Sequence, residues 1–580
     1  MIRKLTNKKV KRMSDSLEVD NRLEKECRAI KSKHFMTKRA LYFWGSIIIA
    51  ILLGSLMPLS FSPFGYGFLA PILLAFWLLL ILPGSCKRAF WLSLLFGVSF
   101  FTVGVWWIRI SLLEFGGAPL LLGVFLTLLL ALYLGLYYAL LGYFTLKTQL
   151  SLPFRLGILF PVMGVLFEYI RAQLLTGFPW LSLGYTLTDY PLALWLFPEM
   201  GALMASFWVY LSGGVGGLLL LQIIALSGGK RRVKECDASD APSLVEVAQN
   251  LSLKSVKIYF PALFMVGVVI SVVLGSSALM ADKISPKGEP LKVALIQGNI
   301  AQELKFSEAQ YYEILATYYQ LTAQVAPNVD LIIWPETAIP ALYEQEVTLG
   351  EALRKISQEE RATVMTGIFS GQGSVIRNSV VAYSDQLRSR DQRYDKVHLV
   401  PFGEFLPFRS LLDLFSGMIE IPFSDLTAGR EEQAPFLIHY EVDGAPAITQ
   451  LSTFICYEAV FGDELRYLGK QSDFLVNVSN DAWFGDSIGP WQHFQITRAR
   501  AIELQREMVR ATNNGITALI DRWGEVKAIL PQFEQGVLEV EVMPYEGTTT
   551  YSRVGDLSWL LFLWVVAGLG ALFFRKELKK

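Results

Sequence analysis

Three residues of this chain supply the side chains that acyl transfer needs: a thiol, a carboxylate and an amine. Cys456 follows the strand-like run Ser452–Ile455, Glu336 follows Asp330–Pro335, and Lys396 lies between them in the sequence. A polar residue where a strand ends and a turn begins can face a cleft. A thiol attacks carbonyl carbons, a carboxylate takes up the thiol proton, and an ammonium stabilises the oxyanion that forms. The three residues are therefore candidates for an acyl-transfer site.

Each of these residues also has a purely structural explanation. A cysteine at the end of a strand more often fills the core, and this explanation is favoured for Cys456 taken alone. Glu336 follows Trp-Pro and fits a helix N-terminus or the protein surface equally well, while Lys396 fits a solvated surface. Only the joint sequence context of the three residues separates these explanations from a catalytic site.

The thiol needs a base, because its thiolate is scarce near neutral pH. His398, His439 and His493 lie in the same part of the chain, so residue counting leaves a Cys–His hydrolase open. Glu336 serves instead if a dry pocket raises its pKa, and the apolar run before it suits such a pocket. The backbone N–H of Tyr457, next to the cysteine, offers a second oxyanion donor.

Long apolar runs place this chemistry at a membrane. Hydrophobic residues make up 53% of the 580 residues, and residues 41–86 contain no charged residue of the Asp, Glu, Lys or Arg types. Such runs reach or approach the ~20 residues that a helix needs to cross ~30 Å of hydrocarbon. We expect eight spans, with two in Leu41–Ser85 and one each in Ala89–Ile108, Pro119–Leu146, Pro153–Leu175, Gly201–Leu226, Ile258–Ala281 and Leu557–Phe574.

The basic residues orient these spans. Lys and Arg cluster in residues 1–40, in the inner loops and in residues 575–580, so the positive-inside rule places both termini in the cytoplasm. Residues 41–281 then form a transmembrane region of seven helices, and residues 557–574 form the eighth helix. Residues 282–556 lie on the other side of the membrane. The first span lacks a cleavage site of small residues, which favours an uncleaved anchor.

Two charged residues, Glu168 and Arg171, lie late in the fifth predicted span. A charge in the hydrocarbon region is costly without a partner. The two residues either pair with each other, one helical turn apart, or contact a phospholipid headgroup.

In this orientation only one of the four cysteines lies outside the cytoplasm. Cys27, Cys86 and Cys236 fall on the inner side and Cys456 in the outer segment. Cys456 therefore has no intramolecular disulfide partner in a compartment where disulfides form readily. Such a thiol is either buried and inert or reactive for a purpose.

The outer segment alternates between strand and helix patterns, which is typical of an α/β domain. Helical spacing occurs in Ser307–Val325, Leu349–Glu359 and Gly489–Thr512. The predicted strands are Leu291–Gln297, Asp330–Trp334, Thr363–Phe369, Ser379–Tyr383, Ala447–Ile455, Phe474–Val478 and Ile516–Asp521.

Several blocks of sequence resemble known families. Asp330–Glu336, Tyr394–Pro407 and Ser452–Glu458 resemble the three signature blocks of the nitrilase superfamily, whose triad is Glu-Lys-Cys. With the spans and the further blocks Lys396–Glu404, Gln297–Ile300, Val478–Gly485 and Thr176–Trp180, the chain is similar to apolipoprotein N-acyltransferases. The resemblance implies a polytopic α-helical membrane bundle of eight spans that carries an α/β, nitrilase-like αββα sandwich.

The resemblance also implies roles for particular residues. Glu336 is expected to be the general base, Lys396 the oxyanion-stabilising cation and Cys456 the nucleophile. Three further residues match positions that support the family's site: Glu404, Tyr457 and Glu458.

Four apolar residues are expected to contact substrate or lipid: Phe306, Leu414, Phe415 and Trp483. The family commonly has Trp near the position of Phe306, so an aromatic face is kept but the indole N–H is lost. Leu414 and Phe415 belong to the apolar segment Phe405–Leu426. This segment is either a helix packed on the domain or an arm that touches lipid and guards the cleft.

The implied reaction moves a fatty acyl chain from a membrane phospholipid to the free α-amine of the N-terminal diacylglyceryl-cysteine of an apolipoprotein. A thioester on Cys456 is the expected intermediate, in a ping-pong sequence. We expect a multi-pass protein of the inner membrane, with its catalytic domain in the periplasm, that acts as a monomer without cofactor or metal. The formal net charge of zero and a basic tail without interleaved aromatic residues indicate no nucleic-acid partner.

Two other classes of function stay open at this point. A membrane-tethered amidase or nitrilase would use the same triad and let water attack the thioester, but it would not need eight spans. A transporter or scaffold with an inactive outer domain would be indicated by loss of a triad residue, and all three are present.

Overall fold

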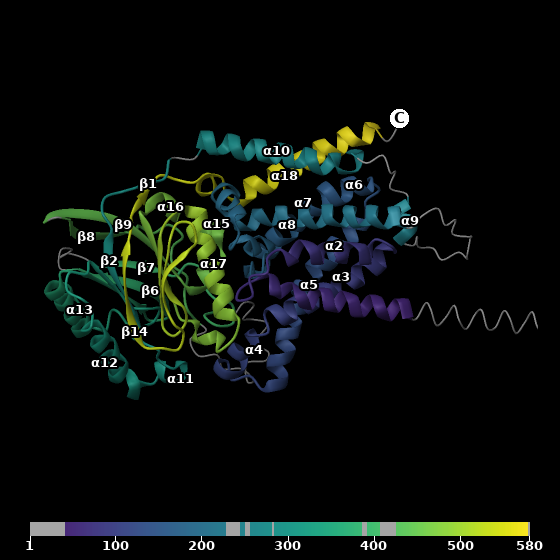
Figure 1. Cartoon of the computed structure of the whole chain (residues 1–580). Helices are drawn as coiled ribbons and strands as arrows, with labels where there is room; N and C mark the ends of the chain where they lie inside the picture. The colour runs from purple at the N-terminus through teal and green to yellow at the C-terminus, as the bar shows by residue number, and fades with distance from the viewer. Residues whose placement is uncertain are drawn as a thin grey trace, which may run out of the picture.

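The chain folds into a bundle of long helices with a two-sheet sandwich at one end, in the computed structural model shown in Figure 1. The structure describes residues 41–227, 244–249, 256–280, 283–384, 391–405, 425–442 and 444–577. The predicted basic tail, residues 1–40, lies outside the described residues, as do Leu414 and Phe415 with most of their apolar segment.

Helices occur at all eight places where spans are predicted. In the described part of the chain, six are long and apolar enough to cross a membrane: Leu41–Ser60, Cys86–Gly104 (α3), Leu120–Lys147 (α5), Leu152–Thr176, Pro191–Ser227 (α8) and Thr550–Leu572. Two apolar helices are shorter, namely Leu69–Ile81 (α2) and Leu263–Gly275, which is part of α10 (Val256–Met280). The protein is thus a multi-pass membrane protein, and the count of eight spans stays a prediction.

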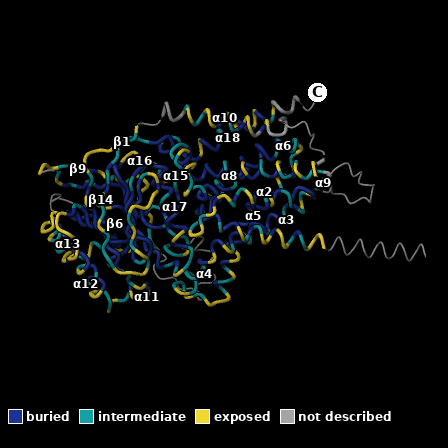
Figure 2. The backbone as a smooth tube through the Cα atoms, viewed as in Figure 1, coloured by how far each residue is buried: buried dark blue, intermediate teal, exposed yellow. Residues whose placement is uncertain are grey.

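The outer surface of the bundle is apolar. Leu121 of α5 is 85% exposed and Phe125 is 59% exposed, and such exposed residues line the outermost helices (Figure 2). An apolar side chain in this position is stable only if hydrocarbon replaces water around it.

The two charged residues of the fifth span point into the protein. Glu168 and Arg171 lie in α7 (Phe160–Gln173) and are 4% and 2% exposed. Glu168 accepts hydrogen bonds from the hydroxyls of Ser206 and Tyr210 at 2.6 and 2.9 Å, and Arg171 donates to the carbonyl of Trp180 at 2.5 Å. These internal partners satisfy both charges without a direct ion pair between the two residues, and contact with a phospholipid headgroup stays a prediction.

Two mixed sheets form the sandwich. The first has the order β14-β2-β3-β5-β6-β7, with β4 beside β5, and the second has the order β13-β12-β11-β10-β9-β8. The strands of the first sheet are β2 (Leu291–Gln297), β3 (Leu331–Ile333), β4 (Ile339–Leu342), β5 (Thr363–Gln372), β6 (Val375–Tyr383), β7 (Gln392–Asp395) and β14 (Gly536–Val542). Those of the second are β8 (Phe436–Val442), β9 (Ala445–Ile455), β10 (Phe474–Ser479), β11 (Met508–Thr512), β12 (Thr517–Ile520) and β13 (Val526–Leu530).

Helices cover both outer faces of the sandwich. Helices α12 (Tyr311–Thr322) and α13 (Val347–Glu360) pack on the first sheet, and α17 (Gly489–Leu504) lies along the second (Figure 1). Residues such as Val293 and Val476 fill the space between the sheets. The resulting αββα layers agree with the α/β fold expected from the alternating patterns.

One predicted helix is too long. The expected helix Gly489–Thr512 ends at Leu504, where Gln505 adopts a left-handed conformation with φ of 51°. Residues Met508–Thr512 instead form β11, which is buried and pairs with β10 in parallel. The apolar spacing after Leu504 fits both a helix and a buried strand, and pairing with β10 decides between them.

Helix α17 docks the sandwich on the membrane bundle, next to α8. The side-chain carbonyl of Gln492 in α17 accepts hydrogen bonds from Trp107 and Trp180 at 3.1 and 2.7 Å, and both tryptophans belong to the bundle. Arg498 of the same helix pairs with Asp189 of the bundle at 2.7 Å. These contacts hold the sandwich in a defined orientation relative to the spans.

Candidate active site

Glu336 stands at the carboxyl end of β3, in a turn that leaves it 6% exposed. Its Oε1 accepts from the side-chain amide of Asn378 at 2.8 Å, and its Oε2 accepts from the backbone N–H of Asn480 at 2.8 Å. Gly367 of β5 passes so close that a Cβ there would lie 2.7 Å from the Cα of Glu336. The neighbouring strand therefore needs glycine at this point for the carboxylate to reach its place.

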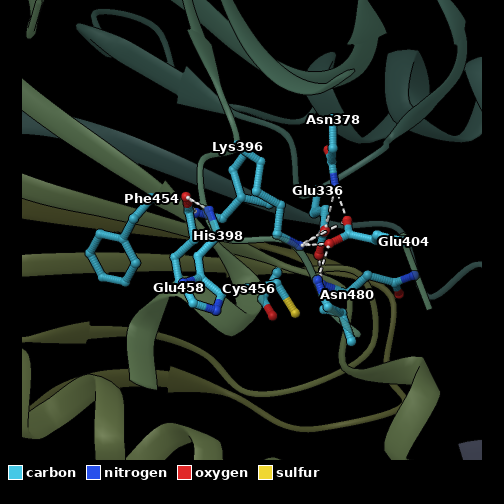
Figure 3. Close-up of polar contacts among 12 residues, drawn as sticks. Glu336, Asn378, Lys396, His398, Glu404, Phe454, Cys456, Glu458 and Asn480 are labelled. Carbon is cyan, nitrogen blue, oxygen red and sulfur yellow. Dashed lines mark hydrogen bonds and ion pairs between the residues drawn. The ribbon is translucent and has the colours of Figure 1, made fainter. Parts of the chain in front are cut away.

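Lys396 follows β7 and is 1% exposed. Its Nζ lies 3.4 Å from a carboxylate oxygen of Glu336 and 2.9 Å from one of Glu404 (Figure 3). Burial alone would lower the pKa of Lys396, but the carboxylates of Glu404 and Glu336 outweigh burial and raise that pKa above its ordinary value. Lys396 is therefore a permanent cation between two carboxylates at neutral pH.

Cys456 directly follows β9 and lies beside the group formed by Lys396, Glu336 and Glu404 (Figure 3). Its backbone has φ of 49°, a left-handed conformation that is rare for a residue with a side chain. Burial, and after it the Glu336 carboxylate, raise the pKa of the Cys456 thiol, which Lys396 opposes only in part. The resting thiol keeps its proton, so it can act as a nucleophile only when a base removes that proton.

Glu458 ties the cysteine turn to the lysine loop. One of its carboxylate oxygens accepts from the backbone N–H of Ile455 at 2.6 Å. The other accepts from the backbone N–H groups of Val397 and His398 at 2.7 and 3.2 Å and from the Tyr394 hydroxyl at 2.9 Å. A buried carboxylate with four donors fixes the distance between the residues on either side of it.

Tyr457 joins the site to the membrane bundle. Its hydroxyl donates to the carbonyl of Gly177 at 3.2 Å, and its ring packs against Phe461. Gly177 belongs to the sequence block Thr176–Trp180, which lies between two helices of the bundle. The residue after Cys456 thus contacts the helical bundle directly.

The apolar residues expected to contact substrate lie in different places. Phe306 is half-buried, with its ring centroid 6.4 Å from that of Phe369. Trp483 is half-buried against the bundle, where its ring meets Phe115 and its carbonyl accepts from Ser111 at 2.6 Å. Contacts of Phe306 and Trp483 with substrate stay a prediction.

Of the three histidines that left a Cys–His hydrolase open, His398 and His493 bond groups other than the Cys456 thiol. His398 bonds Glu464 at 3.0 Å, and His439 lies half-buried on β8. His493 is buried, and its Nε2 meets the carbonyl of Cys456 at 3.0 Å rather than the thiol. Glu336, whose carboxylate raises the pKa of the thiol, is the better candidate for the base.

Cys456 belongs to a group of possible metal ligands. Ligand atoms of Cys456, Asp481 and His493 lie within 4.8 Å of one another. The guanidinium of Arg510, however, bonds both oxygens of Asp481 at 3.0 and 2.8 Å and Nδ1 of His493 at 3.1 Å. A fixed cation therefore already neutralises the carboxylate, and a metal ion would have to displace it.

Three residues near the base were not predicted as site residues: Asn378, Asn480 and Lys305. Asn378 donates to both Glu336 and Glu404, and Asn480 belongs to a quoted sequence block that carried no assigned role. Lys305 is 1% exposed and donates to the backbone carbonyl of Glu336 at 2.9 Å. Its position directly before Phe306 was the one signal in the sequence that could have identified it.

Lys305 should make stability depend on pH. Burial lowers its pKa from 10.5 to about 8, and Glu336 and Cys456 oppose this shift only in part. Between pH 8 and 10.5 the native state binds fewer protons than the unfolded state, so this residue increases stability as pH rises. The gain is on the order of 3 kcal/mol, from about 1.4 kcal/mol for each pH unit of the shift.

The measurement is the apparent Tm in detergent at pH 7 and pH 10 for wild type, Lys305→Met and the exposed control Lys355→Met. Relative to Lys305→Met, wild type and control should both gain stability between the two pH values. An equal pH response in all three proteins would contradict the shifted pKa of Lys305.

Comparison with known proteins gives two matching families. Residues 292–550 match the sequence profile of carbon-nitrogen hydrolases, and residues 53–215 match that of the apolipoprotein N-acyltransferase N-terminal domain. An apolipoprotein N-acyltransferase from Haemophilus ducreyi is 34% identical over 545 residues, which cover 92% of this chain and 97% of the relative. One from Pasteurella multocida is 35% identical over 540 residues, covering 91% and 96%.

Among solved structures, a CN-hydrolase superfamily protein from Xanthomonas campestris covers 44% of this chain and 91% of its own, with 19% identity and a TM-score of 0.30.

Proposed function

Because the chain belongs to the apolipoprotein N-acyltransferase family, we propose that it carries a fatty acyl group from a membrane phospholipid to an apolipoprotein. The acceptor is the α-amine of the N-terminal diacylglyceryl-cysteine. The observation that carries this proposal is the meeting of Cys456, Glu336 and Lys396 in one buried site beside membrane helices. Both substrates are anchored in lipid, so an enzyme fixed at the bilayer meets them at high effective concentration.

The first half-reaction loads the enzyme. Glu336 takes the thiol proton of Cys456 as sulfur attacks the ester carbonyl carbon of the phospholipid. The carbonyl oxygen becomes an oxyanion, which the Lys396 ammonium and the backbone N–H of Tyr457 stabilise. When the tetrahedral intermediate collapses, the carbon–oxygen bond breaks and the leaving alkoxide takes the proton from Glu336. A lysophospholipid departs, and a thioester remains on Cys456.

The second half-reaction transfers the acyl group from Cys456 to the acceptor. The free α-amine of the acceptor attacks the thioester carbonyl, and Glu336 takes the proton that the amine loses. The carbon–sulfur bond then breaks, the thiolate regains its proton from Glu336, and an amide leaves with the acyl chain. Lys396 and Tyr457 stabilise the same oxyanion in both half-reactions, so one site serves both steps.

The location of the site follows from this chemistry. We place the protein in the inner membrane, with residues 282–556 in the periplasm and both termini in the cytoplasm, as the basic flanks indicate. The enzyme acts as a monomer, because all proposed catalytic groups come from one chain.

The test follows a labelled acyl group. The purified protein in detergent is given a phospholipid with a radiolabelled acyl chain, and protein-bound label is measured before and after hydroxylamine treatment. We expect hydroxylamine-labile label on wild type, and Cys456→Ser shows whether the label is on that thiol. Adding a diacylglyceryl-cysteine peptide with a free amine should move the label to the peptide, whereas the N-acetylated peptide should leave it on the protein.

The same experiment decides between transfer and hydrolysis. A membrane-tethered amidase would release the label as free fatty acid at a rate that the peptide does not change. Failure of a competent phospholipid to label the protein would refute the proposed donor.

A further inference from the structure

The peptide bond between Cys456 and Tyr457 is held at one end by a buried side chain. His493 of α17 is 0% exposed, and its Nε2 lies 3.0 Å from the carbonyl oxygen of Cys456. In a trans peptide the carbonyl and the following N–H point in opposite directions. A side chain that fixes the Cys456 carbonyl on one side therefore fixes the direction of the Tyr457 N–H on the other.

The contacts of His493 select one tautomer. Its Nδ1 faces Asp481 at 3.0 Å and the guanidinium of Arg510 at 3.1 Å, while its Nε2 faces a carbonyl oxygen, which only accepts. With the proton on Nε2, this nitrogen donates to Cys456 and Nδ1 accepts from Arg510. With the proton on Nδ1, Nε2 would face the carbonyl with its lone pair. We assign the proton of the neutral ring to Nε2, because this tautomer gives the Cys456 carbonyl a donor and Arg510 an acceptor, while the Asp481 carboxylate beside Nδ1 takes its donors from the same guanidinium.

The ring charge agrees with this assignment. Burial, and after it the neighbouring Arg510, lower the pKa of His493, although Asp481 opposes them. The ring is thus neutral at neutral pH. Asp481 and Arg510 are themselves 2% and 0% exposed. Together with His493 they form a fixed cluster contributed by α17, β11 and the turn after β10.

The backbone at the nucleophile needs such support. Cys456 has φ of 49°, and a residue other than glycine in this left-handed conformation is strained and persists only where its surroundings hold it. Tyr457 lies in the first turn of a 3₁₀ helix, Cys456–Val460, where backbone N–H groups have no partner within the helix. Its N–H is available to a substrate oxygen only if the Cys456–Tyr457 peptide keeps its orientation.

We propose that His493 is a positioning residue for the oxyanion site: by donating to the Cys456 carbonyl, it aims the Tyr457 N–H at the oxygen of the reacting carbonyl. This inference rests on the proposed function, since it presumes acyl transfer to Cys456. Arg510, held by both oxygens of Asp481, donates to Nδ1 and thereby favours the tautomer that donates from Nε2. The Nε2 of His493 bonds the backbone carbonyl of Cys456 and not its sulfur, so the proposed action runs through the backbone.

Two reactions of the Cys456 thiol distinguish a role of His493 in the oxyanion site from a role in supporting the thiol or the fold. Acylation by p-nitrophenyl palmitate forms an oxyanion, whereas alkylation by iodoacetamide displaces iodide and forms none. His493→Leu should slow acylation of Cys456 by roughly 10²–10³-fold, as loss of one oxyanion donor does. Alkylation of Cys456, followed by mass spectrometry of its peptide, should stay within a few-fold of wild type.

Two further variants serve as controls. His493→Gln places an amide N–H near the lost Nε2–H and should recover acylation in part. His439→Leu removes a half-buried histidine on β8 and should change neither reaction.

The remaining outcomes contradict the inference. Equal loss of alkylation and acylation in His493→Leu would show that His493 supports the thiol or the fold instead. Unchanged acylation in His493→Leu, or no recovery in His493→Gln, would also overturn it. The test ester, p-nitrophenyl palmitate, is not a phospholipid. If wild type is acylated by this ester but not by phospholipid, the proposed phospholipid donor is refuted and the role of His493 is still tested by the ester.

Discussion

Glu336→Gln should slow thioester formation on Cys456 by roughly 10²–10⁴-fold, the range for loss of a general base. Burial and the Glu336 carboxylate itself raise the pKa of the thiol, so almost no thiolate exists without proton transfer. Glutamine keeps the shape of the side chain and an oxygen for the Asn480 N–H, which isolates the loss of basicity from the loss of packing.

The pH dependence identifies the cause of this loss. In Glu336→Gln, hydroxide must remove the thiol proton, so labelling from phospholipid should increase about tenfold with each pH unit below the thiol pKa. Wild type should respond less steeply above neutral pH. Glu359→Gln changes an exposed glutamate on α13 and should behave as wild type. A Glu336→Gln protein that labels at nearly the wild-type rate would show that another group is the base.

Lys396→Met should remove both an oxyanion donor and the cation between two buried carboxylates. We expect thioester formation to decrease by roughly 10²–10³-fold. The free energy of unfolding should decrease by roughly 3–5 kcal/mol, because Glu336 and Glu404 lose their shared partner. Labelling rate and apparent Tm in detergent measure the two effects.

A double variant separates the two effects. In Lys396→Met/Glu404→Gln one carboxylate is neutral, so much of the lost stability should return, while the rate should stay low because no cation faces the oxyanion. Recovery of both properties would mean that Lys396 only balances charge. Recovery of neither would mean that burial of the methionine side chain, not carboxylate repulsion, causes the loss of stability.

The positions of the candidate catalytic residues were predictable because they depend on local patterns. Glu336 and Cys456 stand where apolar runs end, and the structure has β3 and β9 ending directly before these turns. Parallel strands bring such ends to one edge of a sheet, and face-to-face packing of two sheets brings the two edges together. The αββα sandwich itself came from the family resemblance, not from the strand patterns.

Contacts between distant segments were not predictable in this way. The position of the Lys305 ammonium beside the Glu336 carbonyl depends on the path of the chain after β2. Arg510 reaches Asp481 only because β11 pairs with β10 and continues the sheet. The apolar run of α2 contains 13 helical residues, and its length in the sequence did not reveal where the helix ends. Strands β8, β13 and β14 were not among the predicted strands, and the structure defines them by their pairing with β9, β12 and β2.

Because α17 docks on α8, the helical bundle and the sandwich pack against each other without a separating boundary. One continuous hydrophobic core contains residues of both, from Leu74 and Phe197 in the bundle to Ile496 and Leu504 in α17. An excised sandwich would expose this apolar face to water and lose the tryptophan partners of Gln492. The sandwich is therefore not an autonomous unit with an anchor attached, because its core is continuous with that of the bundle.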